Sequence, residues 1–220
     1  MRLHGIHGPN YTVDRAVCVY ARADPPMPNS LSPKRIFLIR HGETEWSLNG
    51  RHTSRTDLEL TAEGERRAAE LESVFAHHAF DLVLTSPRVR AVRTCELAGL
   101  LPKAEHTEDL REWDYGDYEG LTTSTIRETD PSWTIFHDGV PNGETAEDVA
   151  ARVRRVIDRA AAVPGDVVLF SHGHALRVLA AVWLRLAPED GERFYLETGT
   201  ISILGFERDM RVIRMWNGRV

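Results

Sequence analysis

The stretch Ile36-Phe37-Leu38-Ile39-Arg40-His41-Gly42 places four apolar residues directly before an arginine, a histidine and a glycine. A short apolar run of this kind is typical of a strand that is buried on both faces of a parallel sheet. The pattern returns at 81–85, before Ser86-Pro87, and at 166–170, before Ser171-His172-Gly173. The chain therefore has several candidate inner strands, each followed by polar residues.

Helical patterns separate these strands. Thr61 is a candidate N-cap for a helix with the apolar face Ala68, Leu71, Phe75 and His78, and a second helix is predicted over 87–99. Thr145 and Asp148 form a capping-box-like pair before the stripe Val149, Val153, Val156 and Ala160. A last helix carries Leu176, Leu179, Trp183 and Leu186, and strands close the chain at 200–206 and 211–216. This alternation predicts an α/β protein, a three-layer α/β/α sandwich with a mostly parallel central sheet.

The 220 residues predict one domain and a tail. Residues 1–35 contain a proline-rich run and are expected to form a flexible or loosely packed extension, in which Val13 to Val19 could add a strand. Residues 36–220 are expected to form the domain itself. Hydrophobic residues at 42% and charged residues at 27% exclude a disordered or fibrous chain.

The charge balance excludes some partners. With 27 basic and 33 acidic residues the net charge is −6, so we expect no nucleic-acid partner. The apolar runs are too short to span a bilayer, so no membrane association is expected. Cys18 and Cys95 have no metal-ligand spacing, and the first residues lack an apolar signal region. These features favour a cytoplasmic protein, a monomer or a homodimer.

The polar residues after the strands indicate an anion site. The carboxyl ends of parallel strands meet at one edge of a sheet, and ligands bind there. Arg40, His41, Arg90 and His172 could therefore surround one small anion, since guanidinium groups match phosphate oxygens. The glycine after each histidine is expected to leave room for a substrate.

The segment Arg40-His41-Gly42-Glu43-Thr44-Glu45-Trp46 resembles the signature of the histidine phosphatase superfamily, in the branch that contains cofactor-dependent phosphoglycerate mutases. The resemblance covers residues 36 to about 206 and implies a phosphoglycerate mutase-like fold. Further segments continue it in the family's order: Gly50-Arg51-His52-Thr53, Leu60-Thr61, Ser86-Pro87-Arg88-Val89-Arg90-Ala91, 112–120, Pro141-Asn142-Gly143-Glu144 and Ser171-His172-Gly173.

The resemblance implies a role for each matched residue. His41 would attack phosphorus and become a phosphohistidine, and Arg40, Arg90 and His172 would form the phosphate pocket. Glu112 would protonate the leaving alcohol and then activate water. The cations beside His41 are expected to lower its pKa and keep it neutral. The scheme requires no metal and no cofactor.

Departures from the mutases favour a phosphatase. Ser47 stands at the mutases' asparagine and Thr123 at their lysine, and the arginine-bearing insertion that grips a carboxylate is not recognisable. The run from Leu110 to Gly120 looks most like small bacterial acid phosphatases and sedoheptulose-bisphosphatase-like members. We therefore expect hydrolysis of small phosphorylated metabolites, with substrate contacts from Ser47, Arg51, Thr53, Tyr115 and Gly173.

Other interpretations stay open at this point. The protein could be a phosphoglycerate mutase or a non-catalytic phosphate-binding module. His172 and His174 could form a metal-binding pair, although no carboxylate is placed to complete it. Several residues have a structural alternative: Glu112 as an exposed loop acid, Arg51 in a surface ion pair, Glu43 in a structural hydrogen bond, Arg88 and Arg93 on solvated helix faces, and Trp113, Tyr115 and Tyr118 in the core.

Overall fold

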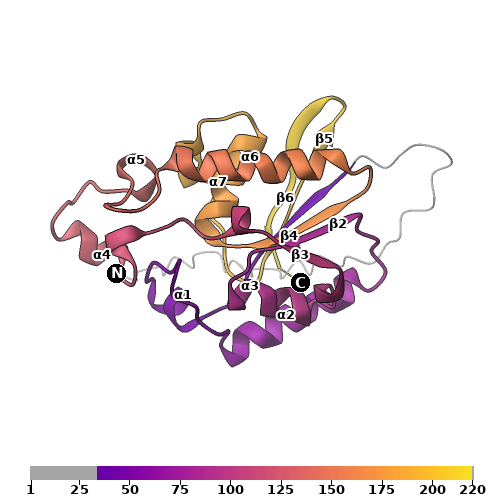
Figure 1. The fold of residues 1–220 in the computed structure, drawn as a ribbon, viewed down its shortest axis with the longest axis horizontal. Helices are drawn as coiled ribbons and strands as arrows, with labels where there is room; N and C mark the ends of the chain where they lie inside the picture. The colour runs from indigo at the N-terminus through magenta and orange to yellow at the C-terminus, as the bar shows by residue number, and fades with distance from the viewer. Residues whose placement is uncertain (1–33, 220) are drawn as a thin grey trace, which may run out of the picture. The chain divides into compact units, whose positions relative to one another are not determined.

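A computed structural model describes residues 34–219. In this part of the chain six strands form one sheet in the order β3-β2-β4-β1-β5-β6 (Figure 1). The first four strands in that order are parallel, whereas β5 pairs antiparallel with β1 and β6 antiparallel with β5. The bounds are β1 Ile36–Arg40, β2 Leu82–Thr85, β3 Ala104–His106, β4 Val167–Ser171, β5 Ile201–Glu207 and β6 Met210–Gly218. The predicted α/β fold with a mostly parallel sheet is confirmed.

Helices cover both faces of the sheet (Figure 1). On one side lie α2 (Ala62–Phe75) and α3 (Val89–Leu97), and on the other α6 (Ala146–Ala162) and α7 (Gly173–Trp183). Short elements connect them: α1 Glu45–Asn49, α4 Thr123–Arg127, α5 Ile135–Asp138, and the 3-10 turns η1 Leu101–Lys103, η2 Glu108–Leu110, η3 Gly116–Tyr118 and η4 Pro188–Arg193.

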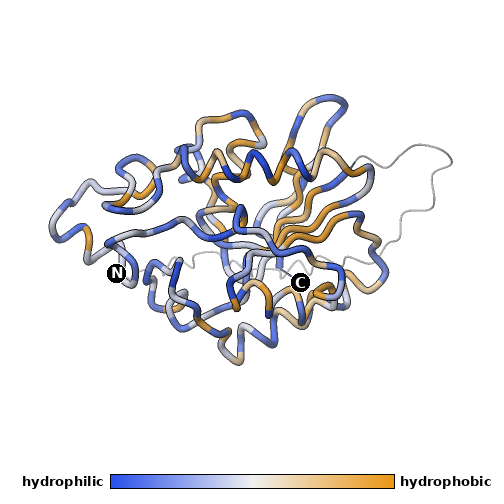
Figure 2. The backbone as a smooth tube through the Cα atoms, in the orientation of Figure 1, coloured by the Kyte–Doolittle hydropathy of each residue, from blue (hydrophilic) through white to orange (hydrophobic). Residues whose placement is uncertain are grey.

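The inner strands β1, β2 and β4 are buried on both faces of the sheet, as their continuous apolar runs predicted. Ile36 and Leu38 of β1 belong to the core beneath α6 and α7, whereas Phe37 and Ile39 belong to the core beneath α2. This division follows the two-residue period of a strand. Figure 2 shows the hydrophobic colour concentrated along the inner strands.

The helix starts follow the predicted caps. The Thr61 hydroxyl accepts a hydrogen bond from the N–H of Gly64 at the start of α2. Thr145 and Asp148 form a reciprocal capping box at the start of α6, whose predicted stripe is fully buried. These contacts satisfy backbone N–H groups that have no partner within the helix.

Several details of the prediction are wrong. His78 and Leu186 lie beyond the ends of α2 and α7, and Leu186 is exposed. The helix predicted over 87–99 begins only at Val89, so Pro87 precedes it. Strand β3 was not predicted, because its short edge position leaves only one of its residues half-buried. Arg93 pairs with Glu65 and Glu96 on the surface as expected, but the Nε of Arg88 is buried without a hydrogen-bond acceptor in the described residues.

The predicted extension falls almost entirely outside the described residues, as does the possible strand from Val13 to Val19. Of its last residues, Arg35 donates to the Asp166 carboxylate from both its backbone and its guanidinium group. None of the helices between residues 34 and 219 has the length and hydropathy of a membrane span.

Candidate active site

The structure brings the two His-Gly segments together at the carboxyl ends of β1 and β4. These strands are neighbours, and the register pairs Arg40 with Ser171. The N–H of His41 donates to the carbonyl of Ser171, 3.0 Å away. His172 is the N-cap of α7, and the centres of the two histidine rings lie 5.1 Å apart. The sheet topology therefore produces the convergence that the sequence predicted.

His41 is held as a neutral imidazole with one nitrogen available. Its Nδ1 lies 2.7 Å from the carbonyl oxygen of Gly42, which can only accept, so Nδ1 carries the proton. Burial lowers the pKa of His41 well below its ordinary value of 6.5, and the charges of Arg90 and Arg40 lower it further. Burial is thus the larger cause, although the sequence prediction rested on the cations. The lone pair of the ring is on Nε2.

Arg90 and His172 form a buried pair. The Nε of Arg90 donates to Nδ1 of His172 at 3.2 Å, so Nε2 of His172 carries the proton and donates to the Ser86 hydroxyl at 2.8 Å. The terminal nitrogens of Arg90 donate to the carbonyls of Thr53, Ser54 and Thr56. Both predicted pocket residues therefore lie close behind His41, with most of their hydrogen-bonding groups already occupied.

Arg40 has an unused donor. One terminal nitrogen of its guanidinium group donates to the carbonyl of Leu196, whereas its Nε is buried without an acceptor among residues 34–219. A buried N–H without a partner is rare in native structures, so the Nε of Arg40 is an exception to the usual rule. Arg40 and His41 line the same cavity.

The two glycines that follow the histidines have different neighbours. A Cβ on Gly173 would lie 3.2 Å from Cζ of Arg40, so this glycine lets the guanidinium group approach the start of α7. A Cβ on Gly42 would lie 2.7 Å from the carbonyl oxygen of Gly64 in α2. The expectation that both glycines leave room for substrate is therefore wrong for Gly42, which instead allows close backbone packing.

Glu112 is buried and faces the same cavity. Its Oε1 accepts from the backbone N–H groups of Trp113 and Ala175, both at 2.9 Å, and its Oε2 accepts from that of His174 at 3.2 Å. Two of these donors belong to the first turn of α7, whose N–H groups have no intrahelical acceptor. The carboxylate is thus fixed by backbone, and the alternative of an exposed loop acid is excluded.

A second buried carboxylate supports the loop that carries Glu112. Glu144 accepts from the guanidinium groups of Arg152 and Arg111 and from the N–H of Asp114. Its backbone carbonyl accepts from the indole N–H of Trp113 at 2.8 Å. The segment Pro141-Asn142-Gly143-Glu144 therefore acts on the site indirectly, by anchoring the loop.

The cavity in front of His41 has a volume of about 570 Å³. All five residues predicted to contact substrate lie on its wall: Ser47, Arg51, Thr53, Tyr115 and Gly173. The Ser47 hydroxyl, however, is engaged with the backbone of Thr44 in a capping box. Arg51 lies over the ring of Trp46, 5.7 Å from its centre, and forms no ion pair within residues 34–219. Among these residues Arg51 therefore makes a cation–π contact in place of the surface ion pair of the alternative.

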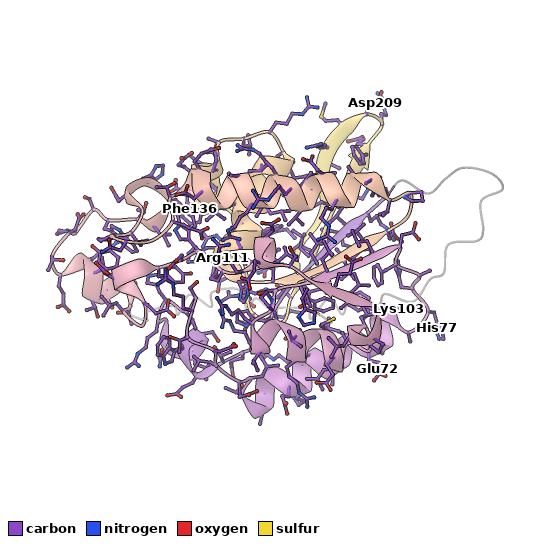
Figure 3. All side chains as sticks on the ribbon, in the orientation of Figure 1. Glu72, His77, Lys103, Arg111, Phe136 and Asp209 are labelled. Carbon is purple, nitrogen blue, oxygen red and sulfur yellow. The ribbon has the colours of Figure 1, made fainter. Side chains whose placement is uncertain are left out.

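The structure also shows the contacts of the other residues for which the sequence left a structural alternative. The Glu43 carboxylate accepts a structural hydrogen bond from the Thr61 hydroxyl at 2.7 Å. Trp113 is fully buried against Phe136, and Tyr118 packs on Trp133. In Figure 3, His77 and Lys103 lie at the opposite end of the molecule from Phe136, which lines the cavity.

Sequence reasoning assigned no substrate contact to several polar residues on the cavity wall, among them Arg127, His174 and Arg177. Arg177 and His174 lie on α7 beside Gly173, and the helical spacing from Gly173 to Arg177 could have indicated a shared face. Arg127 ends the short helix α4 in the irregular middle of the chain, where no periodic pattern pointed to it.

His172 and His174, the possible metal-binding pair, form hydrogen bonds with other side chains. His172 contacts Arg90 and Ser86, and Nδ1 of His174 lies 2.6 Å from the Tyr115 hydroxyl. Across residues 34–219, no group of three or more histidine, cysteine or acidic side chains is arranged to hold a metal ion.

Together, the fold and the site define an α/β protein with a cluster of histidines and arginines at the carboxyl ends of its parallel strands. The chain belongs to the histidine phosphatase superfamily (branch 1), whose family model matches residues 36–219. It is 41% identical over 181 residues to an acid phosphatase of Mycobacterium tuberculosis, covering 80% of this chain and 89% of that one. It is 39% identical over 193 residues to a sedoheptulose 1,7-bisphosphatase of Saccharomyces cerevisiae, covering 73% and 70%.

A solved structure agrees with this assignment. The product of an open reading frame of Mycobacterium tuberculosis superposes with a TM-score of 0.81 at 39% identity, covering 84% of this chain and 98% of that one. The predicted family and its mutase-like fold are confirmed, and the relatives named as phosphatases agree with the expected activity.

Proposed function

We propose that this protein hydrolyses small phosphate monoesters by transferring the phosphoryl group to His41. The observation that carries the proposal is the state of that residue. Its Nδ1 proton is held by the Gly42 carbonyl, its Nε2 has the lone pair, and Arg40 lines the same cavity. A neutral histidine beside a buried cation suits attack on an anionic phosphorus centre.

The reaction would proceed in two transfers. Nε2 of His41 forms a bond to phosphorus while the bond from phosphorus to the ester oxygen breaks, and Glu112 gives that oxygen a proton. Glu112 then takes a proton from water, whose oxygen forms a bond to phosphorus while the bond from phosphorus to Nε2 breaks, which releases inorganic phosphate and restores the neutral His41. Arg40 stabilises the negative charge on the phosphoryl oxygens, with Arg90 and His172 behind it.

The cavity wall supports an anionic substrate. Arg51, Arg127 and Arg177 line it together with Arg40, whereas its only carboxylates among the described residues are Glu112 and Glu192. A few cations focused in one cleft can bind a small anion although the whole chain carries −6. The cytoplasmic location and the monomeric or dimeric state remain predictions.

A phosphoglycerate mutase is the alternative. A mutase must keep a phosphorylated donor and reorient it, and a charged grip on the substrate suits that task. At the position of the mutases' lysine, Thr123 lines the cavity with a hydroxyl that lies 3.3 Å from Nε2 of His52. This uncharged contact favours hydrolysis over retention of the intermediate.

The test compares His41→Ala with His77→Ala, a control at an exposed histidine. Hydrolysis of p-nitrophenyl phosphate should fall by about 10³-fold or more in His41→Ala and stay unchanged in the control. Full activity of His41→Ala would refute the proposal. Interconversion of 3- and 2-phosphoglycerate, stimulated by 2,3-bisphosphoglycerate, would favour the mutase, and no turnover at all would favour a binding module.

A further inference from the structure

His174 and Tyr115 form a polar pair on the cavity wall that the proposed reaction does not use. The Tyr115 hydroxyl lies 2.6 Å from Nδ1 of His174, and both residues line the cavity. The backbone N–H of His174 also donates to the Oε2 of Glu112, so this residue helps to anchor the proposed acid. Because the leaving alcohol must lie near Glu112, a side chain of the cavity wall that adjoins this anchor is a candidate contact for the alcohol half of a bound ester.

The hydrogen bond determines which nitrogen of His174 carries a proton. Tyr115 is 2% exposed, and its hydroxyl has no other acceptor in the described part of the chain. Its proton therefore goes to His174, because a buried unsatisfied O–H is costly. With Nδ1 accepting, the proton of the neutral ring is on Nε2. Burial and the charge of Arg177 lower the pKa of His174 well below 6.5, which keeps the ring neutral.

The ring is also fixed in direction. Phe136, Tyr115, His52 and Trp113 surround it, with ring centres 5.4, 5.8, 6.0 and 6.3 Å away. Its Nε2 has no hydrogen-bond partner among residues 34–219, and His174 lines the cavity. A rigid, neutral donor without a partner is suited to an uncharged oxygen acceptor.

We propose that His174 selects the alcohol half of the substrate by donating its Nε2–H to a hydroxyl oxygen of a phosphorylated sugar or polyol, with Tyr115 as the positioning residue that fixes the tautomer. This inference rests on the proposed phosphatase function. It assigns the substrate class to polyhydroxylated alkyl phosphates and predicts that aryl phosphates, which lack such a hydroxyl, bypass the contact.

The test measures kcat/KM on two probes, fructose 6-phosphate and p-nitrophenyl phosphate. The variants are His174→Phe, Tyr115→Phe and the double variant, in which neither polar partner is left unsatisfied. Tyr118→Phe, outside the cavity wall, is the matched control. In His174→Phe and in the double variant, kcat/KM on the sugar phosphate should fall about 3- to 10-fold relative to that on the aryl phosphate, the size of one hydrogen bond.

Tyr115→Phe should give a smaller fall of the same selectivity, since the ring can then take either tautomer. A long-range ¹H–¹⁵N spectrum of the wild type should show the Nε2–H form of His174. Equal losses on both probes would indicate a structural role and overturn the proposal, as would no loss or an Nδ1–H tautomer. Failure of the wild type to hydrolyse p-nitrophenyl phosphate would instead overturn the proposed function itself.

Discussion

Replacement of Glu144 by glutamine should destabilise the fold although this residue does not touch the cavity. Its carboxylate accepts from Nε and one terminal nitrogen of the buried Arg152 at 3.0 and 3.1 Å, and from Arg111 at 2.6 Å. It also accepts from the N–H of Asp114 at 2.9 Å. In Glu144→Gln the amide NH₂ would face one of these donors, and the charge that compensates Arg152 would be lost.

The magnitude follows from the burial of Arg152, which is 1% exposed. Removing one partner of a buried ion pair typically costs about 3–5 kcal/mol, because the other charge stays buried without compensation. Another terminal nitrogen of Arg152 still donates to the carbonyls of Asp109 and Arg111, so part of its hydrogen bonding remains. We therefore expect a loss near the lower end, about 3 kcal/mol.

The assay is urea unfolding, compared with a matched control in α6, the helix that carries Arg152. Glu147 pairs with Arg154 on the surface, where both side chains are about half exposed or more. Glu147→Gln should cost only about 0–1 kcal/mol. If Glu144→Gln unfolds within 1 kcal/mol of the control, the ion pair does not hold the Glu112 loop and the reasoning is refuted.

Three further predictions concern protonation and packing. Since burial and Arg90 lower the pKa of His41, the acid limb of kcat/KM should lie well below pH 6.5 once substrate ionisation is allowed for, and a limb at 6.5 or above contradicts a neutral nucleophile. Burial lowers the pKa of His52 to about 4, so this residue stabilises the fold fully above pH 6.5 and loses that contribution as the pH falls towards 4. In His52→Gln, the free energy of unfolding should therefore fall by about 3 kcal/mol less between pH 7 and pH 4 than in the wild type. An equal fall in both proteins would count against this prediction. Gly42→Ala should destabilise by about 1–3 kcal/mol in urea, because its Cβ would meet the Gly64 carbonyl, and wild-type stability would restore the idea that this glycine serves the substrate.

Most of the sheet could be predicted from local patterns. Continuous apolar runs in the sequence predict the buried strands. The caps at Thr61 and Thr145 determine where their helices begin, through contacts within a few residues. The edge strand β3 escaped prediction because it has few buried residues to produce a pattern. The ends of α2 and α7 were placed too late, since His78 and Leu186 continue the spacing without continuing the helix.

The sequence by itself determined the strands other than β3, the main helices and the identity of the residues at the strand ends, because these depend on periodicity and on motifs that are local in the chain. The strand ends also predicted one site for Arg40, His41 and His172, to which the family resemblance added Glu112. Only the tertiary structure decided what each does there. Arg90 donates a hydrogen bond to His172, and backbone N–H groups in the first turn of α7 hold the Glu112 carboxylate. Gly42 packs against the backbone of Gly64. Tautomers, burial and unsatisfied donors depend on residues that are distant in sequence, and only packing brings those into contact.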